Sequence, residues 1–236
     1  MDKNKHEVIT LNCPENMSGG IMVCGYNFGF SREDEANEMT GIQNEREEKS
    51  FFSDPSVNGT RFKNKLVTLI QSWGVPLQTD PCHASGFERS FFQTNWIMTQ
   101  TRSITGAEKI DIETLVENSE SILNLIERRA PRVILFVGSQ LIEALNDIRI
   151  RGDVERILGA RPGNAVHHVS DVPTTGRQFK VLIQQFPHTT VVSIPHVTGT
   201  QGLRDDYMEG FAPLMREILL EESVVEQKLE LCPEGG

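Results

Sequence analysis

The chain has 236 residues, of which 38% are hydrophobic, and it carries a formal net charge of -10. This length is enough for one large α/β domain with a buried core. No run approaches the ~20 apolar residues that a membrane helix needs. The four cysteines are scattered without a C-x-x-C pair, which argues against a disulfide framework, a zinc site and an iron–sulfur cluster. The opening "MDKNKHEVIT" has no signal-peptide core, so we expect a cytoplasmic protein.

The acidic excess is concentrated in residues 31–49 and 205–234, so the remainder of the chain is nearly neutral. The overall charge argues against a polyanionic partner, but a local basic face remains an alternative to an ordinary solvated surface. The basic residues that could form such a face are Arg61, Lys63, Lys65, Arg102, Arg177 and Lys180.

The first half of the chain is expected to place short strands between helices. In chain order we expect a loose arm (1–18), a strand (21–24), a polar acidic segment (31–50), turns (53–60), an amphipathic helix (61–73), a strand (90–98) and a helix (111–129). The helix over 61–73 has apolar residues on one face, and Gly74 follows its end.

The second half continues this alternation. We expect a buried strand (132–138), a helix (139–148), a Gly/Pro-rich loop (149–176) with a short strand (166–169), two strands (178–186 and 190–195), a last helix (203–223) and an acidic tail (224–236). Strands that alternate with helices predict a parallel sheet covered on both faces. We therefore expect one α/β domain over 1–236, a three-layer α/β/α sandwich with a central, mainly parallel sheet.

Ligands of open α/β sheets bind beyond the carboxyl ends of the strands. Three segments follow predicted strands in this way: "GYNFG" (25–29), "TNWIMTQTR" (94–102) and "PHVTGTQG" (195–202). Each contains one polar residue of interest, and these are Asn27, Asn95 and His196.

Each of these residues also has a purely structural interpretation. Asn27 between two glycines is typical of a turn. Asn95 within an apolar strand must find partners or cost roughly 1–3 kcal/mol, and its carboxamide suits either neighbouring backbone or the edge of a nucleobase. His196 alone among the histidines combines a strand end with a Gly-rich loop and a helix, although His167, His168 and His188 remain alternatives.

Taken together, the three segments resemble the uracil-DNA glycosylase superfamily. "GYNFG" resembles its first motif, with Asn27 at the water-positioning Asp/Asn. "TNWIMT" is similar to its base-reading strand, with Asn95 at the asparagine. "PHVTGTQG" resembles its second motif, with His196 at the histidine, and "VILFVGSQLIEAL" is similar to the strand–glycine–helix unit between them. The order of these motifs matches over roughly residues 20–220.

The chain also departs from that family's pattern. Phe28 and Val197 stand where prolines are usual, and Thr198 replaces a serine. Residues 149–186 look like extra material, and the cysteine ligands of the iron–sulfur branches are absent. Because proline fixes φ near -65°, its loss frees both loops to reshape the site. A modified or damaged pyrimidine is therefore favoured over plain uracil, with defence against phages that carry modified cytosines as one setting.

The resemblance implies a base-flipping hydrolase that needs neither metal nor cofactor and leaves an abasic site. His196 would stabilise the leaving base and Asn27 would hold the attacking water, while Asn95 reads the base. The aromatic residues that could stack on the base are Phe52, Phe51, Phe30, Phe28 and Tyr26. The residues that could contact DNA are Thr198, Thr200, Gln201, Leu203, Arg61, Lys63 and Arg102.

No lysine matches a motif position, so the resemblance implies a monofunctional enzyme without lyase chemistry. We expect a monomer that binds DNA and no membrane. The alternatives are a conventional uracil-DNA repair enzyme, a hydrolase of free nucleosides, and a non-catalytic nucleic-acid- or nucleotide-binding module on the same fold.

Overall fold

The computed structural model of the chain describes residues 6–29, 49–54, 60–78, 84–98, 100–101, 110–161, 163–174 and 176–221. Its main sheet contains β1 (Ile21–Gly25), β3 (Phe91–Asn95), β5 (Val133–Val137), β6 (Val166–Val169), β7 (Lys180–Gln185) and β8 (Thr190–Ile194). The strand order is β3-β1-β5-β8-β7-β6. The first four are parallel neighbours, whereas β7 and β6 are antiparallel. The expected mainly parallel α/β sheet is therefore confirmed, with an antiparallel edge.

The helices differ from the expected ones mainly where the chain breaks them. In order they are α1 (Pro14–Met17), α3 (Arg61–Ser72), α4 (Gly86–Arg89), α5 (Ile112–Glu117), α6 (Ser119–Arg129), α7 (Ser139–Leu145), α8 (Arg151–Leu158), α9 (Asp205–Glu209) and α10 (Ala212–Leu220). The expected helix over 111–129 is two helices that meet at Asn118, and the one over 203–223 is also two. α8 lies in a region expected to be loop, where Val154 and Leu158 are buried.

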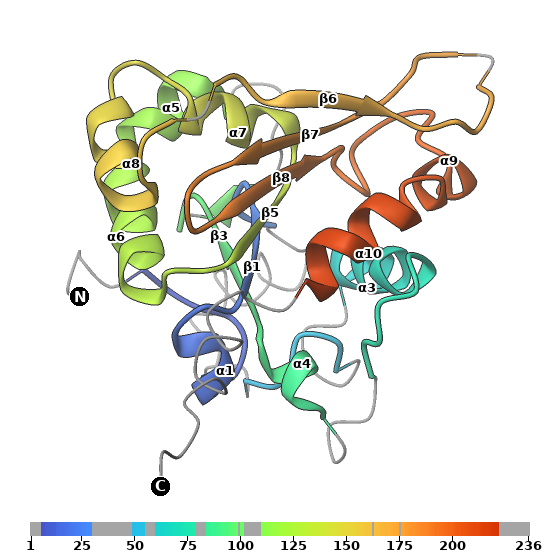
Figure 1. Cartoon of the computed structure of the whole chain (residues 1–236), viewed down its shortest axis with the longest axis horizontal. Coiled ribbons are helices and arrows are strands. Elements are labelled where there is room, and N and C mark those ends of the chain that lie inside the picture. Colours follow the sequence, from blue (N-terminus) through green and yellow to red (C-terminus); the bar gives the residue numbers. More distant parts are fainter. Residues whose placement is uncertain are drawn as a thin grey trace, which may run out of the picture.

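The strands alternate between two hydrophobic clusters, one on each face of the sheet. Leu135 of β5 packs in the cluster with α3, α9 and α10, while Ile134 and Phe136 pack in the cluster with α5 to α8. Figure 1 shows these two groups of helices on opposite sides of the strands. Because both faces are covered, β5 can be the continuous apolar run Val-Ile-Leu-Phe-Val.

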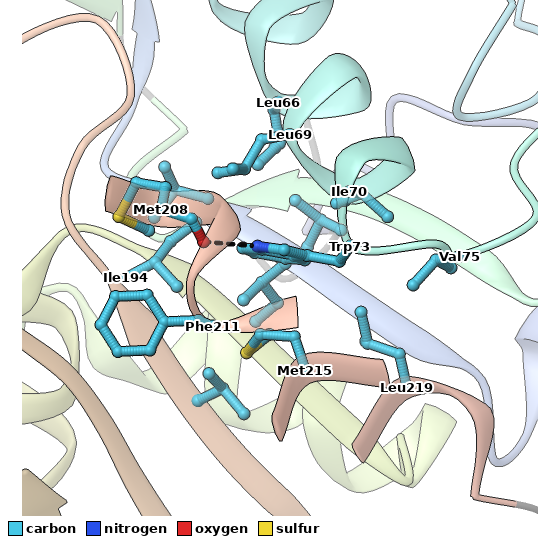
Figure 2. Close-up of a cluster of buried hydrophobic side chains, with 14 of the residues drawn as sticks. Leu66, Leu69, Ile70, Trp73, Val75, Ile194, Met208, Phe211, Met215 and Leu219 are labelled. Atoms are coloured by element: carbon cyan, nitrogen blue, oxygen red, sulfur yellow. Dashed lines mark hydrogen bonds between the residues drawn. The ribbon is translucent and has the colours of Figure 1, made fainter. Parts of the chain in front are cut away.

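Trp73 closes the first cluster between α3 and the C-terminal helices. Its indole is fully buried, and its Nε1 donates to the carbonyl of Met208 at 2.9 Å. Figure 2 shows the ring lying among Leu66, Ile70, Met215 and their neighbours. This bond satisfies the one polar atom of a large buried ring, so α3 is fixed against α9 and its amino end is held over the sheet.

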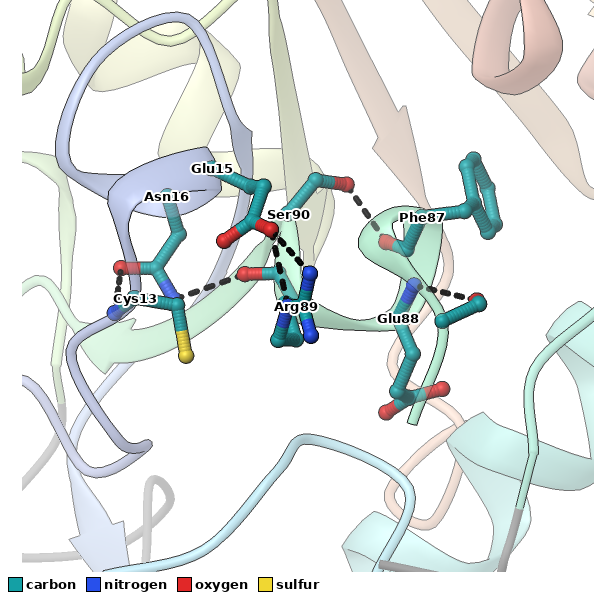
Figure 3. Close-up of polar contacts among 8 residues, drawn as sticks. Cys13, Glu15, Asn16, Phe87, Glu88, Arg89 and Ser90 are labelled. Atoms are coloured by element: carbon teal, nitrogen blue, oxygen red, sulfur yellow. Dashed lines mark hydrogen bonds and ion pairs between the residues drawn. The ribbon is translucent and has the colours of Figure 1, made fainter. Parts of the chain in front are cut away.

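Residues 6–18 do not form the loose arm that we expected. Ile9 donates its backbone N–H to Gln93 at 2.8 Å, and the Thr94 hydroxyl donates to the carbonyl of Glu7 at 2.6 Å. Further on, the Asn16 side chain and the Arg89–Glu15 pair tie α1 to α4 (Figure 3). The segment therefore covers the free edge of β3, which sequence periodicity did not reveal.

A second, two-stranded sheet joins the loops that follow β1 and β3. β2 (Phe28–Gly29) pairs in parallel with β4 (Gln100–Thr101). The first two motif loops therefore run side by side beyond the main sheet. Within the described ranges, none of the helices has the length and apolar character required to cross a membrane. The expected acidic tail, 224–236, lies outside the described residues.

Candidate functional site

The three motif segments meet at one edge of the sheet because their strands are parallel. β1 ends at Gly25, whose Cα partner is Asn95 at the end of β3, and β8 ends two residues before His196. The rings of Tyr26 and His196 have centroids 6.1 Å apart, and Phe62 of α3 lies 5.3 Å from His196 on the same measure. Asn27 follows Tyr26 directly and is half-buried. We call Tyr26, Asn27, Phe62, Asn95 and His196 the strand-end cluster.

Asn95 lies across the glycine that ends β1. A Cβ on Gly25 would stand 2.7 Å from Asn95 Oδ1 and 3.7 Å from Phe62 Cζ. The carboxamide thus occupies the space that a side chain at position 25 would fill. The sequence requires glycine here for close approach rather than for backbone freedom, and the result is an asparagine fixed beside an aromatic ring.

The Asn95 carboxamide is buried without a hydrogen bond to any residue in the described ranges. The residue is only 5% exposed. Its backbone carbonyl, in contrast, accepts a bond from His6 Nε2 at 2.7 Å, and His6 Nδ1 pairs with the Ser121 hydroxyl at 2.9 Å. The backbone of Asn95 is therefore held from behind, while its donor and acceptor remain available for a ligand.

The environment of His196 fixes which ring nitrogen carries the proton. The backbone N–H of Gly199 donates to His196 Nδ1 at 3.0 Å. Nδ1 is therefore the acceptor, and the neutral ring carries its hydrogen on Nε2. Burial lowers the pKa of His196 below its ordinary value of 6.5. At neutral pH the residue is an uncharged donor through Nε2.

Tyr26 stacks on the His196 ring. It is 7% exposed, and its hydroxyl accepts from the backbone N–H of Gln140 at 3.3 Å. Burial raises the pKa of the Tyr26 phenol. A Cβ on Gly138 would stand 2.2 Å from the Tyr26 ring, so this ring sits against bare backbone where β5 gives way to α7. Tyr26 is thereby held as a neutral, rigid side chain.

The loop after His196 supports the histidine and exposes its own tip. Thr200 donates its N–H to the His196 carbonyl at 3.2 Å, and Val197 is 8% exposed within the core. Thr198 and Thr200 are half-buried and Gln201 is exposed. Leu203 packs against the core. Of the residues of this loop expected to contact DNA, Gln201 is the one that is exposed.

Two of the expected site residues lie in the interior instead. Phe52 is fully buried, and its ring stacks on Phe91 at 5.3 Å between centroids, at the opposite end of β3 from Asn95. Lys63 is 4% exposed, and its Nζ donates to the carbonyl of Asp54. Phe52 therefore offers no ring face to a base, and Lys63 offers no surface charge to a phosphate. Both belong to apolar or polar packing that their neighbours in sequence do not reveal.

The remaining expected residues have mixed outcomes. Arg61 is exposed at the start of α3, beside Phe62. Phe51 is half-buried and lines a small cavity with Lys63 and Gln93. Phe30, Arg102 and the side chain of Phe28 lie outside the described residues.

Phe62 is the member of the cluster that sequence reasoning missed. Its spacing within 61–73 assigned it to the apolar face of a helix, and in the structure it is half-buried and packs against the first cluster. That same face ends over the strand ends rather than over the middle of the sheet. No local signal distinguishes these positions; only the docking of α3 does.

Within the described ranges, no three His, Cys, Asp or Glu side chains gather as a metal site. Comparison with models of known protein families gave no match, and comparison with curated proteins gave none either. The geometry of the strand-end cluster is therefore the basis for assigning a function.

Proposed function

We propose that the protein is a monofunctional DNA glycosylase, similar to the uracil-DNA glycosylases, that flips a modified or damaged pyrimidine out of DNA and hydrolyses its N-glycosidic bond. The observation that carries this proposal is the neutral His196 with its hydrogen on Nε2, at the same edge of the sheet as the Asn95 carboxamide, which has no hydrogen bond among the described residues; the Phe62 ring lies near both. Together they offer donors and an acceptor to the polar edge of one flat base.

The chemistry follows from charge. As the bond to C1′ breaks, negative charge collects on the leaving pyrimidine, and a donor aimed at that charge lowers the barrier. His196 supplies it through Nε2–H without needing a proton from solvent. Its uncharged state suits a site between the Tyr26 and Phe62 rings, where a buried cation would be costly.

Asn27 is assigned to the attacking water. It follows the carboxyl end of β1, one residue after Tyr26, and is half-buried. A carboxamide is a poor base, so its contribution is to position the water against the oxocarbenium-like sugar. None of the cluster residues is an amine, so the proposed mechanism has no Schiff-base step.

DNA would approach the cluster from the side of α3 and the 197–203 loop. Arg61 is exposed at the amino end of α3, where the helix dipole also favours a phosphate. Gln201 is exposed in the loop, and we assign to it the filling of the space left by a flipped nucleotide. The overall charge of -10 makes this binding weak and salt-sensitive.

The experiment is incubation of the purified protein with ordinary DNA, uracil-containing DNA and phage DNA that carries substituted cytosines. Released bases are identified by mass spectrometry, and abasic sites by alkali cleavage. We expect a modified pyrimidine to be released, by the wild type and by His188→Ala, whose histidine is exposed on the surface. Release of uracil alone would restore conventional repair, and binding without any release would indicate a non-catalytic module.

A further inference from the structure

The two antiparallel strands are the last two in the order of the main sheet, and the proposed function does not use them. β6 is the terminal strand, and each of its residues is exposed or half-buried, with Val166 60% and Val169 48% exposed. Successive residues of a strand point to opposite faces, so neither face of β6 lies in a hydrophobic cluster. We call β6, β7 and the connection between them the β6–β7 ribbon.

The β6–β7 ribbon reaches the same ends of the strands as the strand-end cluster. β7 is antiparallel to β8, with Leu182 opposite Ser193. Continued by two residues, this register places Lys180 beside Pro195, which precedes His196. Since neighbouring strands lie about 4.8 Å apart, β7 begins one strand's width from the candidate site. Figure 1 shows the connection between β6 and β7 running out beside α9.

α9 fixes this connection at both of its ends. Ser170 follows β6, and Phe179 precedes β7. The hydroxyl of Tyr207, a buried residue of α9, donates to the carbonyl of Phe179 at 2.8 Å and accepts from the N–H of Ser170 at 3.3 Å. A Cβ on Gly210 would stand 2.1 Å from Ser170 Oγ, so the backbone at the end of α9 packs closely against the ribbon. Because α9 follows the 197–203 loop, the ribbon is held beside that loop.

Two exposed cations of the ribbon have no acidic partner. The Arg177 guanidinium lies 5.7 Å from the centroid of the Phe179 ring, and Lys180 Nζ lies 3.3 Å from His167 Nδ1. Neither side chain forms an ion pair within the part of the chain that the structure describes, and the acidic residue of the ribbon is Asp171. Exposed arginines elsewhere do pair with carboxylates, and these are Arg149, Arg151, Arg156 and Arg204. The ribbon thus offers positive charge next to the candidate site of a chain whose net charge is -10.

We propose that Arg177 and Lys180 are phosphate contacts, and that the β6–β7 ribbon is a second DNA-binding surface on the opposite side of His196 from Arg61. The proposal rests on the proposed function for the position of the DNA over the strand-end cluster. Arg61 begins α3, and Phe62 of that helix reaches the end of β1. The ribbon begins at β7, so β8 and the histidine that follows it lie between the two cationic surfaces.

Cations on both sides of the site suit a flipped nucleotide. Extruding a base costs its stacking and pairing, and contacts to the phosphates on either side of it offset part of this cost. The Arg177 guanidinium is a planar fork of N–H donors that matches a phosphate, and the Lys180 ammonium is a point charge. Such contacts fix the position of the DNA without reading a base, so the ribbon should bind DNA of any sequence.

The test uses the full-length protein and a labelled duplex of ordinary bases, so it does not depend on base release. Dissociation constants are measured by fluorescence anisotropy over a series of potassium chloride concentrations. Each phosphate contact on duplex DNA contributes about 0.9 to the slope of log Kd against the logarithm of the salt concentration. We therefore expect this slope to fall by about 1 in Arg177→Gln and in Lys180→Gln, and by about 2 in the double variant.

The matched control is the double variant Arg128→Gln/Arg156→Gln, which changes the net charge by the same amount. Both arginines are exposed next to Glu127, where α6 ends before β5 begins, so they lie at the other ends of the strands. The control should keep the wild-type slope. A wild-type slope in the double variant of Arg177 and Lys180 would overturn the proposal. An equal decrease in the control would overturn it too, because net charge alone would then account for the binding.

Base release, measured separately on substrate DNA, distinguishes this proposal from the glycosylase itself. Release by the wild type together with unchanged salt slopes in the ribbon variants would support the hydrolysis and refute the ribbon contact. A slope that falls in the ribbon variants and not in the control, without release of any base, would support the ribbon contact and refute the hydrolysis.

Discussion

Two buried asparagines differ in their hydrogen bonding: Asn16 of α1, near the start of β3, and Asn95, the last residue of β3. Asn16 is 1% exposed and Asn95 is 5% exposed. The Asn16 carboxamide donates to the carbonyls of Leu11, Arg89 and Phe91 and accepts from the N–H of Cys13 and from Arg129, all within 3.3 Å. Figure 3 shows its contacts with Cys13 and Arg89. Among the described residues, the Asn95 carboxamide has no such bond.

The difference separates a structural role from a ligand-binding one. At the amino end of the strand, Asn16 and Arg129 satisfy one another and the turns around them, so burial costs little. Arg129 is itself only 7% exposed, and burial, followed by repulsion from Arg128, lowers its pKa. At the carboxyl end, the Asn95 carboxamide has no such partners among the described residues. A donor and an acceptor left in this state are available to a ligand.

The largest expected effect on stability comes from Asn16→Leu. The substitution removes one acceptor of the buried Arg129 guanidinium and leaves the backbone groups of Cys13, Leu11 and Arg89 without their side-chain partner. We expect it to lower the free energy of unfolding by about 3–5 kcal/mol, measured by urea denaturation.

The matching change at the other end is Asn95→Leu. It removes a carboxamide that has no described partner, so we expect a change of less than about 1 kcal/mol in the free energy of unfolding. Base release should nevertheless fall sharply. If Asn95→Leu destabilised the protein as much as Asn16→Leu, the contrast between the two asparagines would be lost.

The next effect is catalytic. His196→Ala removes the neutral donor and Asn27→Ala removes the water-positioning group, so each should reduce base release by about 10²–10³-fold. His188→Ala and Asn164→Ala are matched exposed controls. Rates are measured in single turnover, with circular dichroism to show that each variant is folded. Wild-type rates in both site variants would refute the mechanism.

Much of the scaffold followed from periodicity alone. The apolar run of β5 and the amphipathic pattern of α3 each coincide with the structure to within one residue. The topological rule for strand ends then brought Tyr26, Asn95 and His196 together. These successes share one cause, because continuous burial and helical spacing are local properties of the sequence.

The failures lie where distant segments decide the outcome. Phe52 is an aromatic residue of the type that stacks on a base, but its ring stacks on Phe91 instead. Lys63 is a residue type that often binds phosphate, but its position on α3 directs its side chain inward, toward Asp54. Residues 6–18 lack strand periodicity, yet they bond to β3 largely through backbone atoms and single hydroxyls. Partners of this kind cannot be inferred without the docking of the elements.

A smaller effect is expected from Gly25→Ala, which tests the packing of Asn95 directly. The new Cβ would stand 2.7 Å from Asn95 Oδ1, and a side-chain end can swing away at modest cost. We therefore expect a loss of about 1 kcal/mol in stability and about tenfold in base release, because the carboxamide leaves its position. Gly176→Ala is the control, since nothing lies within 4 Å of its added Cβ. Unchanged release in Gly25→Ala would show that the orientation of Asn95 is irrelevant to activity.

The smallest effect concerns pH and the histidine behind Asn95. Burial, as the largest cause, lowers the pKa of His6 below 6.5, and burial does the same for His196. Between 6.5 and these lowered values the unfolded chain binds more protons than the folded one, so stability falls as the pH falls through this window. His6→Asn removes one of the two groups while keeping a donor near the Asn95 carbonyl, so the decrease in unfolding free energy from pH 7.5 to pH 5.5 should be smaller than in the wild type.

Glu88, whose pKa is raised chiefly by burial, acts in the opposite direction above its ordinary value of 4.5, but it is common to both proteins and cancels in the comparison. His188→Asn, at an exposed histidine, should leave the wild-type pH dependence intact. Urea titrations at the two pH values measure the difference. An identical decrease in His6→Asn and in the wild type would show that His6 has the same pKa in the folded and the unfolded chain. That result would contradict the burial of His6 between Asn95 and Ser121.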